Sequence, residues 1–327
     1  MLKIGNLVIN SKVVLSPLTG VTDYVMRSLI REYSPHCLLT TEMISSEALV
    51  QKSDTAITYT DDKEFPCAWQ IEGHKPEIMA KAAKILENKA AIIDINMGCP
   101  IKKIVNGNDG CSLMRNPMLA KDIVVAVKEA VKIPVTCKFR LGWSLDDINF
   151  VEFAQLMQSA GACAVTIHAR TRAQMYSGNA DWKILERLHG NIDIPYIANG
   201  DITSVQKAKE CLEISKANAV SIGRAATGDL SLIARTEKYI NEDIILPQPD
   251  LSQKIQMLKK HLDFEISFRG QEQGIKYFRK FYPYYIKGIK GGSEYRYKLV
   301  SELNYDNIIN ILNELHHDNS LFENICS

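Results

Sequence analysis

Residues 91–100 read AIIDINMGCP, a run of strand-forming side chains that ends in an abrupt polar turn. Branched aliphatic residues in such a run favour a buried strand, and the Gly-Cys-Pro sequence that follows stops it. Residues 101–114 add Lys102, Lys103 and two glycines, which allow the backbone to approach a ligand closely. The pattern therefore predicts that Cys99 lies at the mouth of a strand beside positive charge, a position typical of reactive cysteines.

Seven further runs of strand-forming residues are spread along the chain. Between most of the runs, apolar residues recur at helical spacing, for example over 76–90, 120–132, 147–161 and 202–215. The eight runs are KVVLSPLTG (12–20), CLLTTEM (37–43), CAWQIEG (67–73), AIIDINMGCP (91–100), PVTCKFRLG (134–142), ACAVTIHAR (162–170), IPYIANGDI (194–202) and NAVSIGRAA (218–226).

Eight strand-and-helix units with nearly continuous apolar strands predict an α/β fold, a TIM (β/α)8 barrel. A doubly wound open sheet is the alternative, but no G-x-G-x-x-G turn follows the first strand. The pattern changes at LPQPD (246–250), which is typical of a linker, and the residues after it have helical periodicity. We therefore expect a catalytic barrel over residues 1–245 and a smaller helical domain over residues 246–327.

Composition limits the partners and the compartment. The 327 residues are 46% hydrophobic and carry 39 Lys and Arg against 38 Asp and Glu, so a nucleic-acid surface must come from local clustering. No apolar run is long enough to span a bilayer and no secretion signal opens the chain, which predicts a cytoplasmic protein without membrane contact. The eight cysteines are then expected to be reduced, and their spacing predicts no structural metal.

Polar side chains at the ends of the eight runs are the place to look for chemistry, because the carboxyl ends of barrel strands converge on one face. The last two runs end in glycines, which leave backbone N–H groups free to point at an anion. The eighth run also contains Arg224, whose guanidinium can form bidentate hydrogen bonds with oxygen atoms. A phosphorylated cofactor is expected there, with Gln70, Lys138 and His168 addressing its polar rings. Flavin mononucleotide (FMN) fits this set.

Six motifs, taken in order, resemble those of the tRNA-dihydrouridine synthase family. The likeness extends from about residue 13 to residue 296 and is greatest to the bacterial B-type subfamily. It implies an FMN-containing barrel with a C-terminal helical tRNA-binding domain, which uses NADPH to reduce selected uridines of the tRNA D-loop. The motifs are SPLTGVTD (16–23), DINMGCPIKK (94–103), TCKFRLGW (136–143), TIHARTR (166–172), IANGDI (197–202) and SIGRAA (221–226).

The resemblance also implies roles for individual residues. Cys99 takes the position of the catalytic thiol, and Asn96 that of an asparagine near the substrate base. The residues expected to bind the cofactor are Ser16, Pro17 and Leu18 in a flavin-contacting turn, Gln70 and Lys138 at the ring and ribityl chain, His168 facing the flavin, and Asn199, Gly200, Asp201, Gly223 and Arg224 at the phosphate. With Asn96, the residues expected to bind the substrate are Lys102, Arg170, Arg279, Lys280 and Lys287.

The chemistry agrees with these roles. Reduction of the uracil double bond needs a hydride at carbon 6 and a proton at carbon 5. Reduced flavin supplies the hydride, and Cys99 can supply the proton as a general acid if its thiol stays protonated. Lys138 or His168 would stabilise the negative charge that develops.

The target base must be unstacked from a folded RNA, which requires backbone contacts elsewhere. Residues 276–298, KYFRKFYPYYIKGIKGGSEYRYK, hold seven cations against one acid and interleave eight aromatic residues. Such mixtures bind phosphates and stack on bases, although aromatic residues in a small helical domain are often its core. The Arg-Lys-His usual in the family appears here as Arg279-Lys280-Phe281, so the resemblance does not fix which uridine is reduced.

Several of these residues have a plainer interpretation. A cysteine at a strand end is often small core filler, and a histidine such as His168 is often satisfied by polar neighbours. Lys138 would then be a buried ion-pair partner of Asp94 or Glu42.

Two other functions remain open beside the tRNA uridine reductase. One is a flavin enzyme that acts on a free pyrimidine, as a dihydroorotate dehydrogenase does, although a small metabolite needs no basic segment. The other is an RNA-binding barrel without catalysis, which would leave competent residues unused. Nothing in the sequence indicates an obligate protein partner, and we expect a monomer.

Overall fold

The computed structural model describes residues 1–51 and 59–326, with side chains as far as residue 319. Eight parallel strands form a ring in the order β3-β13-β12-β11-β8-β7-β6-β4. The ring closes where the Leu15 N–H donates to the Leu38 carbonyl at 2.9 Å. The predicted TIM barrel is confirmed. Its strands are β3 (Val13–Leu15), β4 (Leu39–Thr40), β6 (Cys67–Glu72), β7 (Ile92–Met97), β8 (Val135–Arg140), β11 (Ala164–His168), β12 (Tyr196–Asn199) and β13 (Ala219–Ile222).

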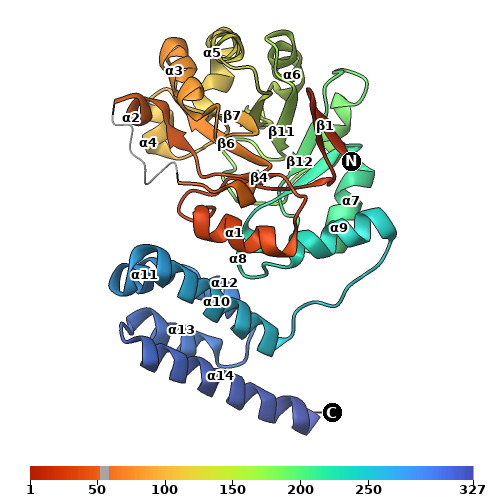
Figure 1. The fold of residues 1–327 in the computed structure, drawn as a ribbon. Coiled ribbons are helices and arrows are strands. Elements are labelled where there is room, and N and C mark those ends of the chain that lie inside the picture. The colour runs from red at the N-terminus through yellow and green to blue at the C-terminus, as the bar shows by residue number, and fades with distance from the viewer. Residues whose placement is uncertain (52–58, 327) are drawn as a thin grey trace.

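Helices on the outside of the ring connect successive strands (Figure 1). Side-chain caps start several of them: Asp23 accepts from the Met26 N–H at 3.0 Å at the start of α1, and Ser204 caps α7. A 3-10 turn, Lys183–Leu188, takes the place of a full helix between β11 and β12. The covering helices are α1 (Tyr24–Tyr33), α3 (Pro76–Leu86), α5 (Pro117–Ala130), α6 (Phe150–Ser159), α7 (Val205–Ser215) and α9 (Leu232–Glu242).

Short elements decorate the loops between strands and helices. β5 pairs with β6 and extends the wall of the barrel beyond β4, and β9 pairs with β10 in a small antiparallel ribbon after β8. These elements are β5 (Ile44–Ser45), α2 (Ser46–Gln51), the 3-10 turns Asp62–Glu64 and Gly110–Arg115, α4 (Lys102–Asn106), β9 (Gly142–Ser144), β10 (Asp147–Ile148) and α8 (Arg224–Thr227).

An antiparallel hairpin of β1 (Leu2–Ile4) and β2 (Leu7–Ile9) covers the amino-terminal end of the barrel. Leu2, Ile4 and Ile9 are buried in one apolar cluster with inward-facing residues at the starts of the strands, including Ala164 and Ala219. Removing this apolar surface from water stabilises the closed end. Sequence reasoning missed the hairpin because strands of three residues have too little periodicity to recognise.

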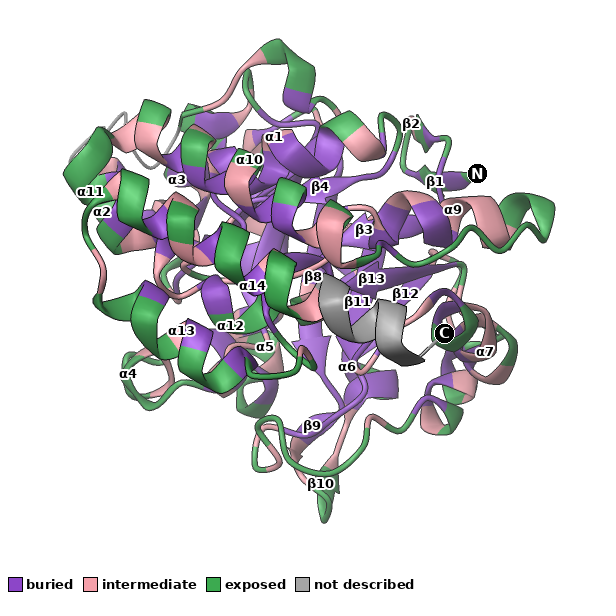
Figure 2. Ribbon diagram, turned by 90° about the horizontal axis from the view of Figure 1, so that it is seen from below, coloured by how far each residue is buried: buried purple, intermediate pink, exposed green. Residues whose placement is uncertain are grey.

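Five helices follow the barrel and form a second layer, blue in Figure 1, below α1, α8 and α9. Residues 243–250 connect the two parts without regular structure, and the predicted division between residues 245 and 246 falls within them. In Figure 2, which looks at the helical layer from below, the near faces of α13 and of the described part of α14 are largely exposed, and the barrel strands behind them are buried. The helices are α10 (Leu251–Arg269), α11 (Gln271–Phe278), α12 (Tyr282–Tyr285), α13 (Gly292–Ser301) and α14 (Tyr305–Cys326).

The helical layer packs against the loop and helix that follow β3, so it borders the carboxyl end of the barrel. Tyr24 packs its ring against Phe264 and Phe268, with centroids 5.9 and 5.2 Å apart. Arg269 pairs with Asp23 of the barrel and, at 2.6 Å, with Glu265 of its own helix. Among the described residues, no helix is long and apolar enough to cross a membrane.

Candidate active site

Cys99 lies in the turn after β7, at the carboxyl end of the barrel, and its side chain is partly exposed. The structure describes seven cysteine side chains; all are free thiols and five are buried. Burial raises the pKa of the Cys99 thiol above its usual range, opposed by a hydrogen bond from the Ile101 N–H. The sulfur therefore keeps its proton at neutral pH, which a general acid requires.

Asn96 shapes the turn that presents the thiol. Its Oδ1 accepts from the backbone N–H of Cys99 at 3.0 Å and from that of Gly98 at 3.2 Å. Its Nδ2 donates to Oε1 of Gln70 at 2.8 Å. Both ends of the Asn96 amide thus bind the protein, and its contact with a substrate base stays a prediction.

Two further contacts support the same turn, and sequence reasoning assigned neither. Arg140, at the end of β8, is 2% exposed and donates from Nε to the Gly98 carbonyl at 2.9 Å. Gly110 has φ +58°, and a Cβ there would stand 2.7 Å from the Cys99 carbonyl oxygen. Only glycine fits beneath the turn. The position of Arg140 at a strand end was the signal that could have identified it.

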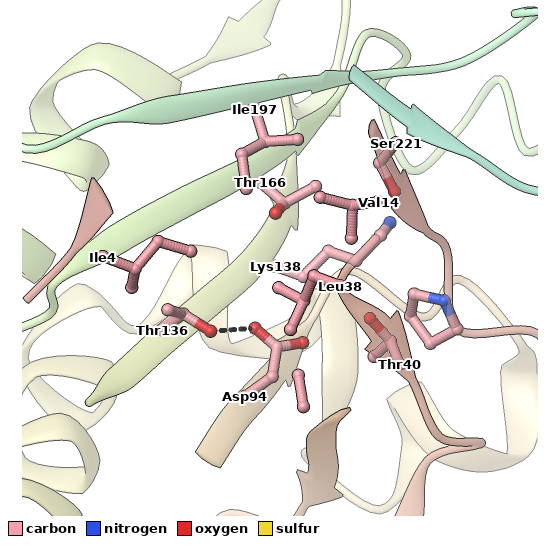
Figure 3. Close-up of a pocket in the computed structure, with 12 residues that line it drawn as sticks. Ile4, Val14, Leu38, Thr40, Asp94, Thr136, Lys138, Thr166, Ile197 and Ser221 are labelled. Carbon is pink, nitrogen blue, oxygen red and sulfur yellow. Dashed lines mark hydrogen bonds between the residues drawn. The ribbon is translucent and has the colours of Figure 1, made fainter. Parts of the chain in front are cut away.

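A buried polar layer lies in the barrel below the thiol turn. Asp94 accepts from Nε2 of Gln70 and from Oγ1 of Thr136, each at 2.6 Å. Burial raises the pKa of the Asp94 carboxyl group. Gln70 therefore has both ends of its amide engaged, and its contact with a flavin ring stays a prediction. Figure 3 shows Asp94 and Thr136 at an interior cavity that Lys138 and Ser221 also line.

Lys138 is the central cation of the site. Its Nζ donates to Oδ1 of Asn199 at 3.2 Å, and no described ion pair joins it to Asp94 or Glu42. Burial, together with the charge of Arg140, lowers the Lys138 pKa to about 8. The plainer interpretation of Lys138 as an ion-pair partner is therefore not supported. At pH 7 most Lys138 side chains still carry their proton and their positive charge.

Hydroxyl and amide groups link the last two strands to the first. Nδ2 of Asn199 donates to Oγ of Ser16 at 3.0 Å and to the Ser221 carbonyl at 2.8 Å. The two serine hydroxyls are 2.6 Å apart. Pro17 lines the interior cavity, and Leu18 packs beside Gly223. The structure thus gathers the predicted first turn with the seventh and eighth strand ends.

His168 and Arg170 are buried at the end of β11. Burial, with the charges of Arg140 and Lys138, lowers the pKa of His168 well below its usual range, so the imidazole is neutral. Arg170 is 2% exposed and donates to Oδ1 of Asp201 at 2.9 Å and to the Ser177 carbonyl at 3.1 Å. This guanidinium holds the loop after β11, and its contact with substrate stays a prediction.

The predicted phosphate residues lie together after β12 and β13. Gly200 has φ +122°, and a Cβ there would stand 2.8 Å from that of Ala180. Although burial opposes it, hydrogen bonds from Arg170 and the Ala180 N–H lower the pKa of Asp201, which is therefore an anion. Arg224 is half exposed, lies 3.7 Å from Asp201, and stacks on the Tyr176 ring. Its guanidinium is available to an anion at the mouth.

The residues predicted to bind the substrate are spread over both parts of the molecule. Lys102 on α4 and Lys287 after α12 are exposed. Lys280 is half-buried, with Nζ 3.1 Å from the centroid of the Tyr277 ring, and it lies beside the loop after β3. Arg279 is partly buried, and its Nε has no hydrogen-bond partner within the part of the chain that the structure describes.

Most aromatic residues of the segment 276–298 form the core of the helical layer. Phe278, Phe281, Tyr282 and Tyr285 are almost fully buried, whereas Tyr297 is 77% exposed. The plainer interpretation of these aromatic residues is therefore confirmed for most of the segment. A phosphate-binding surface here would have to come from the cations. No cluster of residues suited to a metal ion occurs in the described ranges 1–51 and 59–326.

The fold is similar to that of two solved enzyme structures. The old yellow enzyme homologue of Zymomonas mobilis matches with a TM-score of 0.51 at 12% identity, over 77% of this chain and 94% of that one. Morphinone reductase in complex with tetrahydroNAD matches with a TM-score of 0.50 at 13% identity, over 77% and 92%. At this identity the likeness shows the barrel fold alone.

Sequence relatives are much closer. A probable tRNA-dihydrouridine synthase of Rickettsia bellii is 39% identical over 301 residues, which cover 90% of this chain and 92% of that protein. The tRNA-dihydrouridine synthase B of Pasteurella multocida is 36% identical over 299 residues, with 90% of each chain covered. The family model for dihydrouridine synthase matches residues 14–314. The resemblance drawn from the six motifs is confirmed: this chain belongs to the dihydrouridine synthase family.

Proposed function

We propose that the protein is a flavin-dependent oxidoreductase that reduces the 5,6 double bond of specific uridines in the tRNA D-loop, with NADPH as reductant. The observation that carries the proposal is the protonated, partly exposed Cys99 thiol in the turn after β7, with the partly buried cation Lys138 on the neighbouring strand β8. Family membership and the relatives named as tRNA-dihydrouridine synthases support the substrate. Action on tRNA would place the protein in the cytoplasm.

The residues at the mouth fit FMN. Lys138 is a partly buried cation at the interior cavity, suited to negative charge on a ring system. The half-exposed guanidinium of Arg224, with Gly200 and Gly223 in the adjacent loops, suits a phosphate group. Lys138 and His168 would hold the ring, and the loops after β12 and β13 would hold the phosphate. When bound and reduced, the flavin supplies hydride to carbon 6 of the uracil.

The chain supplies the proton and the orientation. Cys99 donates its proton to carbon 5, since burial keeps the sulfur protonated and the turn held by Asn96 and Arg140 fixes its position. Lys138 stabilises the negative charge that accumulates as electrons arrive. Neutral His168 can take part only as a hydrogen-bond partner, because its pKa lies far below neutral pH.

The tRNA would rest on the helical layer beside the mouth. Exposed cations at Lys102 and Lys287 lie on the barrel side and the helical side, so one RNA backbone could contact both. A flipped base then enters the barrel mouth at a cost of a few kcal/mol, offset by these phosphate contacts. We propose that residues 246–327 form the tRNA-binding domain and that one monomer suffices.

The test combines cofactor analysis with substrate choice. The purified protein is examined for bound FMN, then supplied with NADPH and either unmodified tRNA or free uridine, and dihydrouridine is measured by mass spectrometry. We expect yellow protein and product with tRNA only. Comparable turnover of free uridine would instead favour a reductase of free pyrimidines, and protein without flavin would favour an RNA-binding barrel.

A further inference from the structure

Glu72 is a buried acid at the mouth of the barrel that none of the roles above uses. It ends β6, on the same face of the strand as Ala68 and Gln70, because alternate residues of a strand share a face. Ala68 lines the interior cavity and Gln70 joins the buried polar layer, so this face is the inside of the barrel. Glu72 therefore stands one step nearer the mouth than Gln70.

The Glu72 carboxyl group is buried, and one of its oxygen atoms lacks a hydrogen-bond partner in the described part of the chain. The residue is 7% exposed, and its Oε2 is buried without a hydrogen-bond partner among the residues that the structure describes. An unpaired carboxylate in such a place is costly, which favours the protonated acid. Burial, followed by the charges of Asp109 and Glu47, raises the pKa of Glu72 to about 7. The group can thus gain and lose a proton at neutral pH.

The thiol turn lies beside this acid. β6 pairs with β7 so that Ile71 stands opposite Ile95, which brings the end of β6 next to the turn after β7. The loop Asp109–Gly110 joins the two sides: Asp109 Oδ1 lies 2.9 Å from Nδ1 of His74, and Gly110 packs under Cys99. After burial, the negative charge of Glu72 also acts to raise the pKa of Cys99.

The other acidic groups near Glu72 have partners of their own. Asp109 is engaged by His74, and Glu47 pairs at the surface with Lys75, so neither is a buried proton donor. The titratable or charged groups that face Glu72 are Glu47 from α2, His74 beyond its own strand, Lys103 from α4, Asp109 from the loop, and Cys99 from the turn after β7.

We propose that Glu72 acts through Cys99: it returns a proton to the Cys99 thiolate after each reduction. This inference rests on the proposed function. As carbon 6 of the uracil is reduced, the S–H bond of Cys99 breaks and the new C–H bond forms at carbon 5. The thiolate then takes the proton of the Glu72 carboxylic acid, and water at the mouth returns a proton to the carboxylate. Without such a donor, the partly exposed thiolate would depend on a proton from bulk solvent.

The first experiment needs no turnover. Alkylation of Cys99 by iodoacetamide is followed against pH by mass spectrometry of its peptide, in the parent, in Glu72→Gln and in the control Glu77→Gln, which makes the same change on the exposed face of α3. We expect the midpoint to move to lower pH in Glu72→Gln only, since removal of a nearby negative charge favours the thiolate. An unchanged midpoint overturns the inference.

The second experiment separates proton return from proton donation. Prereduced protein converts tRNA in a single turnover, and the same protein with NADPH is followed over many turnovers at pH 7. We expect Glu72→Gln to retain flavin and the first turnover, to lose roughly tenfold in the steady state, and to lose the inflection of the parent near pH 7. Equal losses in both regimes would indicate a structural role and overturn the inference.

Failure of the proposed function can be recognised separately. A parent protein that forms no dihydrouridine in either regime overturns the proposed reaction and, with it, the need for proton return. The alkylation midpoint then still decides whether Glu72 and Cys99 interact.

Discussion

The two ends of the barrel are built from opposite chemistry, and a partly exposed cysteine lies at each. Cys99 follows β7 in a turn held by Asn96 and Arg140. Cys163 precedes β11 at the end closed by the hairpin, where a Cβ on Gly5 would stand 3.2 Å from its sulfur. The residue type is the same, so the neighbours decide what the thiol can do. Among the described residues, the charges of Glu72, Arg140 and Lys138 act on Cys99 at the carboxyl end.

Matched substitution of the two thiols is expected to produce the largest difference. Cys99→Ala removes the proton donor and should lower dihydrouridine formation by about 10²–10⁴-fold, with bound flavin retained. Cys163→Ala should leave the rate unchanged, because it removes a sulfur far from the mouth. The measurements are dihydrouridine per tRNA and flavin absorbance. Similar rates for both variants would contradict the acid role of Cys99.

Truncation at the closed end is expected to affect stability and spare the site. Ile4 is fully buried between the hairpin and the barrel interior, so Ile4→Ala should lower the free energy of unfolding by roughly 2–5 kcal/mol. Urea denaturation measures this loss. Flavin content and the rate per folded molecule should match the parent; a loss of flavin in native buffer would show that the two ends are coupled.

The charge of Lys138 is expected to set an alkaline limit on flavin reduction. Burial lowers its pKa to about 8, so the cation is present below that pH and disappears above it. The rate of flavin reduction by NADPH should fall roughly tenfold as the pH rises through this range. Lys138→Arg keeps its charge at high pH and should flatten the profile, whereas Lys138→Met should be slow throughout. A profile shared by the parent and Lys138→Arg would assign the limit to another group.

Exposed cations are expected to give the smallest effects. Lys102→Gln and Lys287→Gln should each weaken tRNA binding a few-fold and reduce the salt slope by about 1. Lys3→Gln, at the closed end, is the control and should change neither quantity. Binding measured over a series of salt concentrations gives the slopes. Equal slopes for Lys102→Gln and Lys3→Gln would remove α4 from the RNA surface.

Local sequence patterns were sufficient to predict the barrel, because each strand has its own run of strand-forming residues. All eight predicted runs contain one of the eight ring strands, and the helices α3, α5, α6 and α7 lie within or close to the predicted segments. Short elements were not predicted from the sequence. The hairpin of β1 and β2 is stabilised by contacts with the starts of the barrel strands, which are distant in sequence. Contacts of this kind leave no periodicity in a three-residue strand.

The candidate site was predictable as a set of positions and much less as a set of contacts. Cys99 follows β7 and Asn199 ends β12, at the strand ends where the sequence placed them, whereas Lys138 lies two residues before the end of β8 and lines the interior cavity. The engagement of Gln70 by Asp94, and of Arg170 by Asp201, depends on side chains from other strands that meet only in the closed ring. The buried aromatic residues near 278–285 likewise depend on helix packing that their composition does not reveal.

The sequence by itself determined the barrel, the order of its strands along the chain, and the placement of a thiol, a lysine and an arginine-bearing loop at strand ends, because periodicity and turn residues are local properties. Only the tertiary structure decided the protonation state and the hydrogen-bond partners of these groups. Burial keeps the Cys99 proton, and burial together with nearby cations makes His168 neutral and brings Lys138 near its titration range. The fold also leaves Oε2 of Glu72 without a hydrogen-bond partner among the described residues. Solvation and charge at a site are sums over neighbours, and the neighbours are fixed by the closed ring.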